Sequence, residues 1–580
     1  MKLLGFADPS REAPQRPIEA PHLHTEGLLT VALQGGPVYL DGKPVATPAP
    51  AIAAAYQSRG VAFLSRLTGR FALAVADRAA GRVLLALDRM GMERLTYARL
   101  DNGLVFSSSA EAVSRYPGVA APLRLQSIFD YLLLHMIPAP HTVYRGVSKL
   151  RPGTVAVLEN GTLRVERYWQ PRFATNGAAN FEDLRQELHE SLKAAVADCE
   201  PGETSGAFLS GGLDSSTVVG VLSRVALRPP RTFSIGFGVQ EFNEIEYARI
   251  ASRRFNAVAH EYDVTADDVV DAFERIAAAY DEPFGNSSAI PTYYCARIAA
   301  QHGITHMLAG DGGDELFAGN ERYARQKIFE AYWRLPQGLR KGLIQPMVSV
   351  IDPESRIMPA RKLRSYVDQA SIPMPERLES WNYMYRIDLG GMLEPAFRAA
   401  IDTRAPLATM AEVYAQAPSN QLVHRMLFYD WHYTLSDNDL RKVGTMCELA
   451  GVRVSYPMLH PRVIDLSLRV PLNLMARGLQ LRTFYKRAMQ GFLPDEILNK
   501  KKHGFGLPFG VWLKTHPRLR DLIYGLLDGL KGRGIVRPEF LDDLVKQHQD
   551  GHPGYYGYAI WDLAMLEAWL QAHTGNGPVH

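Results

Sequence analysis

The segment AFLSGGLDSS, residues 207–216, joins an apolar run to a serine- and glycine-rich turn, and a helical pattern begins near Thr217. A phosphate site requires this order of strand, loop and helix, because a helix start has unpaired N–H groups and a positive dipole end. Gly211 and Gly212 let the backbone approach an anion without a Cβ clash. Three hydroxyl groups can donate hydrogen bonds to phosphate oxygens, those of Ser210, Ser215 and Ser216.

Asp214 makes this loop chemically specific. A carboxylate beside a polyphosphate repels it unless a divalent cation lies between them, so Asp214 predicts a Mg²⁺ ion. The loop lacks the lysine of a Walker P-loop. The alternative is an ordinary turn in which Asp214 caps the following helix.

A second acidic loop follows in MLAGDGGDELFAG, residues 307–319, again between an apolar run and a helical pattern. In a parallel sheet the loops after two such strands lie at the same edge, where ligands bind. We therefore expect Asp214 and Asp314 to share one Mg²⁺ ion. Asp311 would lie beside them and accept a proton from an attacking amine. Its alternative role is to cap the next helix.

Two further motifs lie between these loops, FSIGF at residues 233–237 and YDEPFGNSS at residues 280–288. The first loop resembles the PP-loop of the ATP pyrophosphatases. All four motifs, in this order, resemble the synthetase domain of the asparagine synthetase B family, which includes β-lactam synthetases and the macrolactam-forming cyclases of lasso peptides. The resemblance implies an enzyme that uses ATP to adenylate a carboxylate and releases AMP and pyrophosphate.

The resemblance also implies roles for individual residues, by motif position. Those that would contact the adenosine are Leu209, Ile235 and Gly310. Those that would hold pyrophosphate and metal are Ser210, Gly212, Asp214 and Ser215, with Asp314 as the second metal ligand. Asp311 stands where the family has an acidic residue or, in β-lactam synthetases, a tyrosine close to the reacting amine.

The C-terminal half departs from the family pattern. Residues 435–460 resemble a segment that ends in a GVEARVPFLD-like string, but Arg453, Ser455 and His460 replace its Glu, Arg and Asp. That segment helps to shape the acceptor side in the family, so these changes argue against asparagine itself as the product.

Basic residues nevertheless remain where the family has them. Arg482 and Lys486 take the lysine and arginine positions of the family's K-x-x-L-R-x-A segment. A cation at each position preserves pyrophosphate stabilisation with a changed geometry, because Arg binds phosphate bidentately. KKKHGFGLP, residues 500–508, resembles the family's K-x-GF-x-x-P loop, and its alternative interpretation is a solvated turn.

The first third of the chain has a β pattern. Three turn pairs each separate two β-prone segments, Asp41-Gly42, Asn102-Gly103 and Asn160-Gly161. Residues 71–76 and 82–87 are apolar throughout, which predicts strands buried on both faces of a layered domain. A helix is expected at residues 125–135.

A polar, turn-rich stretch at residues 171–180 indicates a domain boundary, and a helical pattern at residues 181–197 follows it. Beyond it, β-like runs alternate with helical stretches, which is typical of an open parallel sheet. These runs are residues 206–209, 231–237 and 306–309. Residues 320–580 are expected to be mostly helical. The sequence therefore predicts an α/β protein with domains at residues 1–172 and 180–575.

The N-terminal domain resembles the family's glutamine amidotransferase domain, an Ntn-hydrolase-like β-rich layered fold. GRFALAVAD at residues 69–77, DRMG at residues 88–91 and FSSSAE at residues 106–111 carry the resemblance. Glutamine hydrolysis in that family needs a cysteine at position 2, where this chain has Lys2, and no cysteine precedes Cys199. No counterpart of the family's NGE-containing glutamine-binding string is found. We therefore expect a folded domain that is inactive toward glutamine.

Composition excludes several functional classes. A formal charge of +3 over 580 residues provides no global field that would attract nucleic acid. Three widely spaced cysteines, Cys199, Cys295 and Cys447, fit neither a disulfide framework nor a zinc site, which favours the cytoplasm. No apolar stretch reaches the length of a membrane span, so no membrane partner is expected.

These observations predict an ATP- and Mg²⁺-dependent amide-forming ligase whose amine comes from ammonia or from the substrate itself, as in ring closure. The carboxylate substrate is expected to be a small molecule or a peptide, with a helper or leader-binding protein and a homodimer left open. The alternatives are a glutamine-hydrolysing asparagine synthetase, a PP-loop enzyme that thiolates a nucleic-acid base, and a non-catalytic assembly partner. Low net charge and the lack of a reactive cysteine pair disfavour the thiolation alternative, and retention of both Asp214 and Asp314 disfavours the last.

Overall fold

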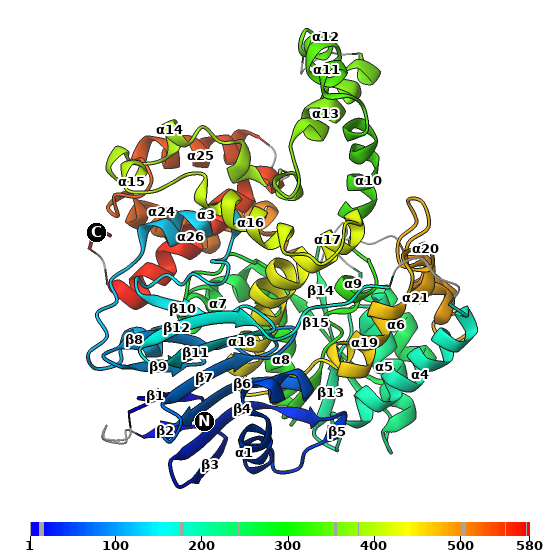
Figure 1. Cartoon of the computed structure of the whole chain (residues 1–580). Helices are drawn as coiled ribbons and strands as arrows, with labels where there is room; N and C mark the ends of the chain where they lie inside the picture. The colour runs from blue at the N-terminus through cyan, green and yellow to red at the C-terminus, as the bar shows by residue number, and fades with distance from the viewer. Residues whose placement is uncertain are drawn as a thin grey trace.

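The computed structural model describes residues 2–10, 17–174, 179–239, 244–352, 357–380, 382–500, 506–551, 553–575 and 577–579. In this part of the chain, two antiparallel sheets form an N-terminal layered domain, and a parallel sheet flanked by helices forms the core of the rest (Figure 1). The predicted α/β class and the contrast between its two halves are confirmed.

The two antiparallel sheets have the strand orders β10-β8-β9-β1-β2 and β12-β11-β7-β6-β4-β3, and β5 pairs with β4. The strands are β1 Leu4–Ala7, β2 Ile18–Glu19, β3 His22–Glu26, β4 Leu29–Leu40, β5 Lys43–Pro44, β6 Leu67–Asp77, β7 Arg82–Leu87, β8 Thr96–Leu100, β9 Gly103–Ser107, β10 Val147–Lys149, β11 Thr154–Glu159 and β12 Thr162–Arg167. Their helical neighbours are α1 Pro48–Arg59, η1 Gly60–Arg66, α2 Ala110–Ser114 and α3 Leu125–Leu134.

The strands at residues 71–76 and 82–87 are buried on both faces, as predicted. Along β6, Leu73 and Val75 pack toward α1 and η1, whereas Ala72 and Ala74 pack toward the other antiparallel sheet. This double burial explains why β6 is apolar throughout instead of alternating. The predicted hairpins are also present, although one turn lies at Asp101–Asn102 and Gly103 already belongs to β9.

The parallel sheet has the order β15-β14-β13-β16-β17. Its strands are β13 Ser205–Phe208, β14 Arg231–Phe237, β15 Val258–Val264, β16 His306–Leu308 and β17 Arg453–Ser455. The helices that follow or precede them are α4 Phe181–Ala197, α5 Leu213–Val225, α6 Ile245–Arg254, α7 Ala266–Ala279, α8 Ala289–Gln301 and α9 Gly313–Leu316. Because β14 and β16 flank β13 in parallel, the carboxyl ends of all three strands meet at one edge.

The remainder is helical, as predicted, apart from β17. Part of it, α10 to α13, projects from the body of the molecule (Figure 1). The elements are α10 Arg322–Trp333, α11 Gln337–Leu339, η3 Arg340–Ile344, α12 Gln345–Ser349, α13 Met358–Ser371, η4 Glu376–Leu378, η5 Tyr383–Arg386, α14 Leu389–Met392, α15 Pro395–Ala399, α16 Ala405–Ala415, α17 Leu422–Asp430, η6 Trp431–Asp439, α18 Leu440–Leu449, η7 Pro457–Leu459, α19 Pro461–Arg469, α20 Leu472–Met475, α21 Thr483–Ala488, α22 Asp495–Asn499, α23 Phe509–Thr515, α24 Pro517–Lys531, α25 Pro538–Asp550 and α26 Pro553–Thr574. Among the described helices, none is long and apolar enough to cross a bilayer.

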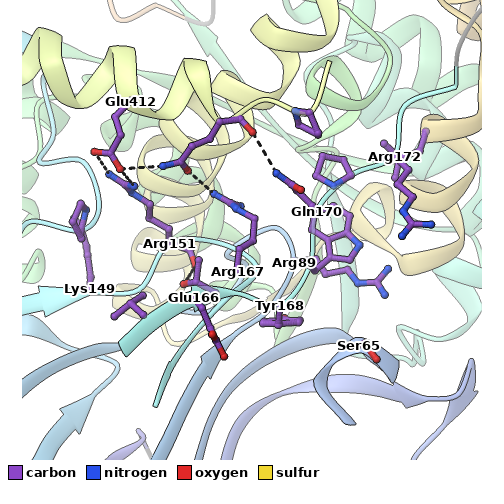
Figure 2. A pocket seen from close by; sticks show the side chains of 18 of the residues that line it. Ser65, Arg89, Lys149, Arg151, Glu166, Arg167, Tyr168, Gln170, Arg172 and Glu412 are labelled. Atoms are coloured by element: carbon purple, nitrogen blue, oxygen red, sulfur yellow. Dashed lines mark hydrogen bonds and ion pairs between the residues drawn. The ribbon is translucent and has the colours of Figure 1, made fainter. Parts of the chain in front are cut away.

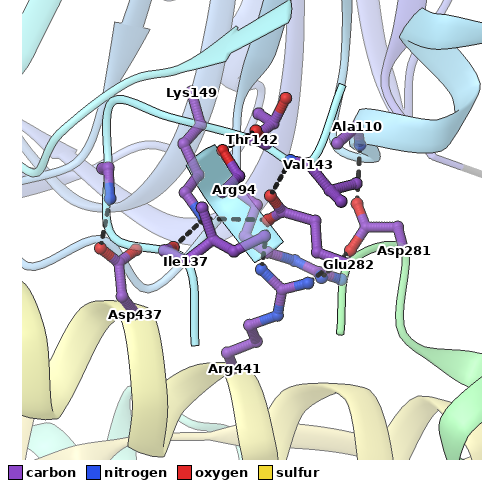
Figure 3. Close-up of polar contacts among 12 residues, drawn as sticks. Arg94, Ala110, Ile137, Thr142, Val143, Lys149, Asp281, Glu282, Asp437 and Arg441 are labelled. Carbon is purple, nitrogen blue, oxygen red and sulfur yellow. Dashed lines mark hydrogen bonds and ion pairs between the residues drawn. The ribbon is translucent and has the colours of Figure 1, made fainter. Parts of the chain in front are cut away.

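A buried cluster of charges joins the two halves (Figure 3). Arg441 of α18 donates to Asp281 at 2.8 Å and to Glu282 at 2.7 Å. The Lys149 ammonium, at the end of β10, donates to Glu282 at 2.9 Å. Burial would raise the pKa of Asp281, but Arg441 and Arg94 outweigh it and hold that pKa well below its usual value.

The loop that carries these two acids is the YDEPFGNSS motif, which serves here as a joint. Asp281 and Glu282 also accept hydrogen bonds from backbone N–H groups of the N-terminal domain, at Ala110 and Val143. On its other side the motif is held by α26, because the indoles of Trp561 and Trp569 donate to Gly285 and Tyr280 carbonyls, respectively. The motif thus contacts both domains at once.

Replacing Arg441 with Met should lower the free energy of unfolding by about 3 kcal/mol, because two buried carboxylates lose a cation that both contact. The measurement is the thermal midpoint of the full chain. Arg115→Gln is the control, since the Arg115 side chain is 67% exposed and its pair with Glu111 is expected to contribute less than about 1 kcal/mol. Equal midpoints for the two variants would contradict a stabilising role of the cluster.

Candidate active site

The turn between β13 and α5 is shaped by its own hydroxyl groups. The Ser210 N–H donates to Ser215 Oγ at 3.2 Å, and the two serine hydroxyls lie 3.0 Å apart. The Gly212 N–H, at the cap of α5, contacts Ser210 Oγ at 3.3 Å. These hydrogen bonds shape the turn, which presents a helix start at the sheet edge, as a phosphate loop requires.

The second acidic loop packs directly on this turn, and glycine makes the close approach sterically feasible. A Cβ atom on Gly310 would lie 2.7 Å from the Ser215 nitrogen, and one on Gly313 would overlap the Asp214 carboxylate. Side chains at these two positions would force the loops apart. The glycines of LAGDGGDE therefore bring Asp214 and Asp314 to the same point.

Arg482 lies between these two carboxylates. Its Nη1 donates to Asp214 Oδ2 at 2.8 Å and to Asp314 Oδ1 at 2.7 Å, and Nη2 also contacts Asp214. Burial opposes the charge of Arg482, but the two carboxylates outweigh it and raise its pKa. The guanidinium of Arg482, which is predicted to contact phosphate, lies between the two carboxylates, at the position expected for a shared cation.

The acid pair is suited to a Mg²⁺ ion. Both carboxylates reach one nitrogen atom, so both could reach one metal ion placed there. Among the described residues there is no group of three or more His, Cys, Asp or Glu side chains that could hold a metal by itself. Asp214 and Asp314 would hold a Mg²⁺ ion through carboxylate oxygens, which this ion prefers, and the ion would supply positive charge for a phosphate group.

The pocket around the acid pair has a volume of about 810 Å³. The predicted residues that line it are Leu209, Ser210, Gly212, Asp214, Ser215, Ile235, Gly310, Asp311, Asp314, Arg482 and Lys486. Gly211 is not in its lining, and Ser216 is fully buried within α5, so its hydroxyl is not exposed to the pocket. Ser216 therefore differs from its predicted role, because the first turn of α5 directs it into the core.

Asp311 lies in a different electrostatic environment from the acid pair. Burial raises its pKa to about 6, although the nearby Lys442 ammonium acts in the opposite direction. Lys442 donates to Asp439 at 2.8 Å, and both residues line the pocket. A carboxylate with a pKa near neutrality can accept a proton from an amine.

Lys442 and Asp439 were not singled out from the sequence. They lie three residues apart where η6 meets α18, within the segment at residues 435–460. The sequence feature that could have identified them is an acidic and a basic residue at helical spacing, within a segment that resembles part of the family's sequence pattern. The apolar wall of the pocket similarly includes Phe233 and Cys295, which no motif marked.

The departures at residues 453, 455 and 460 do not line this pocket, contrary to the expectation that they shape the acceptor side. Arg453 is exposed on β17. The Ser455 hydroxyl contacts His306 at 2.8 Å, and His460 contacts Tyr39 of the N-terminal domain at 2.9 Å. Ser455 and His460 thus lie at the domain boundary, where both line a small cavity together with residues of the N-terminal domain.

Further cations line the pocket, among them Lys486 and Lys500. Lys486 of α21 lines it, and burial together with Arg482 lowers its pKa. Lys500 donates to Glu244 at 2.9 Å and is mostly buried, so it is not part of a solvated turn. Residues 501–505 of the predicted KKKHGFGLP loop lie outside the described residues.

A polar network fills the interior next to the first strand of the N-terminal domain. The Leu3 N–H donates to Gln34 at 2.7 Å, and Gln34 donates to Glu93 at 2.8 Å. Arg70 donates to Glu93 at 2.6 Å and to the Val454 carbonyl of β17 at 2.5 Å. The cavity beside Arg70 has a volume of about 40 Å³, which holds a few water molecules at most.

Lys2, which stands at the family's nucleophile position, is directed away from this network. Its ammonium pairs with Glu448 of α18 at 2.7 Å, and about half of each side chain is exposed. A thiol at this position would face the surface between the domains.

Comparisons with known proteins give a family match for each of the two domains. The asparagine synthase family model matches residues 185–571, and the glutamine amidotransferase domain model matches residues 47–169.

Glutamine-hydrolysing asparagine synthetase 1 of Bacillus subtilis (strain 168) is 22% identical over 510 residues, which cover 87% of this chain and 78% of that protein. Asparagine synthetase 3 of the same strain is 21% identical, with 88% and 80% covered. Asparagine synthetase B of Escherichia coli (strain K12) is 25% identical over 46% of each chain. A solved glutamine phosphoribosylpyrophosphate amidotransferase from B. subtilis covers 50% of this chain and 64% of its own, at 12% identity and a TM-score of 0.17.

Replacing Arg482 with Met should lower the thermal midpoint without ligands, because both carboxylates lose the guanidinium that they contact. Added Mg²⁺ should raise the midpoint of this variant more than that of the wild type, since the ion can take the vacated position. Differential scanning fluorimetry with and without Mg²⁺ measures both effects. Lys486→Met, which removes a cation that pairs with neither acid, serves as the control. Identical Mg²⁺ shifts in all three proteins would refute a shared metal position.

Proposed function

This chain belongs to the asparagine synthase family, whose model matches more than half of it, and we propose that it adenylates the carboxylate of a peptide or amino-acid derivative. As a member of that family it is an ATP-dependent carbon–nitrogen ligase. We propose further that it couples the activated carboxylate to an amine that its own N-terminal domain does not generate. The observation that carries this proposal is the meeting of Asp214 and Asp314 on one guanidinium nitrogen. Two acids at one point of a glycine-rich sheet edge fit a metal-bound triphosphate.

The residues divide the pocket into two ends. Leu209 and Ile235 offer an apolar surface that suits an adenine ring, and Ser210, Gly212 and Ser215 lie where a triphosphate would pass. Asp214 and Asp314 would hold Mg²⁺, which when bound neutralises the phosphate charge and stabilises the departing pyrophosphate. Lys486, at the same end, adds a further positive charge.

The amine end of the pocket is built around Asp311. An amine attacks only in its neutral form, and Asp311 can accept the proton that the amine loses as the carbon–nitrogen bond forms and AMP departs. Lys442, whose charge is favoured by Asp439 and Asp311 against the effect of burial, lies close enough to stabilise the carboxylate form of Asp311. The pair thus supports proton transfer at neutral pH.

The N-terminal domain supports a proposal about the source of the amine. No cysteine precedes Cys199 in the sequence, Lys2 pairs with Glu448 at the surface, and the Gln34–Glu93–Arg70 network occupies the adjacent interior. We therefore propose ammonia or an amine of the substrate itself, as in macrolactam or β-lactam ring closure. The competing candidate is glutamine-dependent amidation, which the names of the relatives favour.

Pyrophosphate release should depend on ammonium or on a substrate amine, and glutamine should not replace either one. The measurement is pyrophosphate release from Mg²⁺-ATP with a panel of amino acids and peptides, each tested with ammonium, with glutamine and with neither. Asp214→Asn should abolish release under all conditions. Lys2→Cys should not create a response to glutamine, because the new thiol would face Glu448. A glutamine response of the wild type would establish the competing candidate instead.

Asp311→Asn should slow amide formation by about 10²–10⁴-fold, the usual contribution of a general base, while carboxylate-dependent exchange of pyrophosphate into ATP persists. In the wild type, kcat/KM should rise with pH through about 6, since the base acts only when deprotonated and its pKa is raised to about 6. The best acid from the panel serves for both measurements. Loss of the exchange reaction in Asp311→Asn would assign this residue to adenylation instead of to amine capture.

A further inference from the structure

A second large cavity lies between the two domains and shares no lining residue with the catalytic pocket. Its volume is about 1340 Å³. One wall comes from the end of β12 and the segment at residues 168–173, and the other from α16 and α19 (Figure 2). The proposed ligase mechanism uses none of these residues.

Arg167 is the central cation of this cavity. Its guanidinium donates to the Gln416 amide oxygen at 3.1 Å and lies 3.5 Å from His432 Nε2, neither of which carries a negative charge. Burial, together with Arg151, lowers the pKa of Arg167 to about 10. Within the described part of the chain, no carboxylate lies at ion-pair distance from it. A half-buried cation with neutral partners favours an incoming anion.

Arg89 and Arg172 extend the positive surface. The Arg89 side chain is 12% exposed, its Nε is buried without a hydrogen-bond partner, and its Asp465 contact at 3.3 Å involves a carboxylate that is 57% exposed. Arg172 is exposed at the rim. Figure 2 shows Arg167 and Arg172 well apart along the cavity, with Gln170 between them.

The acids that face the cavity do not cancel this charge. Glu412 is engaged by Arg151 at 2.8 Å, and Glu166 is exposed. His432 adds no charge, because burial and Arg167 lower its pKa to about 3. Lys149, which also lines the cavity, is neutralised by Glu282. The cations that have no buried acidic partner therefore dominate the charge of the cavity wall.

Aromatic rings lie between these cations. Trp169 stacks on Trp431 with ring centroids 6.2 Å apart, and the Arg89 guanidinium lies over Trp169 at 5.2 Å. Phe173 packs against the same Trp431 ring at 5.6 Å. Such a wall can hold apolar parts of a ligand beside its charged groups.

We propose that this interdomain cavity binds an extended peptide segment that carries acidic side chains. The volume exceeds the roughly 300–1,000 Å³ of most small-molecule sites. Arginines set apart along a wall match several separated carboxylates, whereas a single phosphate calls for arginines that converge on one point. The site goes beyond the proposed function, because it requires neither ATP nor the amide-forming step.

Isothermal titration of the full-length protein, without ATP, tests this proposal with hexaglutamate as the probe. Hexaglutamate should bind, with an affinity that falls as salt rises, and hexalysine should not. Arg167→Gln should weaken binding at least tenfold. Arg164→Gln is the matched control and should leave binding unchanged, because Arg164 lies on the same strand, is 55% exposed and is outside the cavity.

Three results would overturn the proposal: no binding of hexaglutamate, equal binding by wild type and Arg167→Gln, or displacement of hexaglutamate by Mg²⁺-ATP, which would place it in the catalytic pocket. Inorganic triphosphate that binds more tightly than hexaglutamate in an Arg167-dependent manner would replace the peptide with a phosphate ligand. If Arg167→Gln does not fold by circular dichroism, Arg89→Gln provides the same comparison. The outcome is independent of the proposed function, since no measurement requires turnover.

Discussion

Two carboxylates that face each other at the end of a parallel sheet repel unless a cation lies between them, and the catalytic half of this protein is arranged around that constraint. Arg482 meets it with bonds to both Asp214 and Asp314. Its backbone has φ +57°, a left-handed conformation that costs of order 1–3 kcal/mol for a non-glycine residue. The local strain is offset by the placement of a buried guanidinium at the centre of the site.

The same constraint explains two glycines of the second acidic loop. Repelling groups come together only if the backbones that carry them can pack without intervening side chains, and Gly310 and Gly313 remove those side chains. A divalent ion and a guanidinium can each offset the repulsion between the two carboxylates. In the proposed function, Arg482 would exchange carboxylate partners for phosphate oxygens, or share them, when Mg²⁺-ATP binds.

The N-terminal domain is fastened to this half by charges as well as by apolar packing. Arg441, Lys149 and the two acids of the YDEPFGNSS motif are buried at the junction, where an unpaired charge would be costly. The motif also abuts α26, so the junction links both domains and the C-terminal helix. In the proposed function the N-terminal domain contributes architecture and the walls of the basic cavity instead of ammonia.

Local patterns in the sequence determined a large share of this protein. The strands, the hairpins, α4 and the two acidic loops follow from periodicity and turn chemistry over a few residues, and parallel strand order alone predicted that Asp214 and Asp314 would meet. Tertiary structure decided the rest. Arg482 reaches Asp214 across 268 residues, Ser216 turns into the core, and Ser455 and His460 face the other domain. Arg167 meets His432 across 265 residues. Such contacts depend on which distant surfaces pack together, and no short stretch of sequence encodes that packing. Burial at these contacts then determines which charged groups are paired and how their pKa values shift.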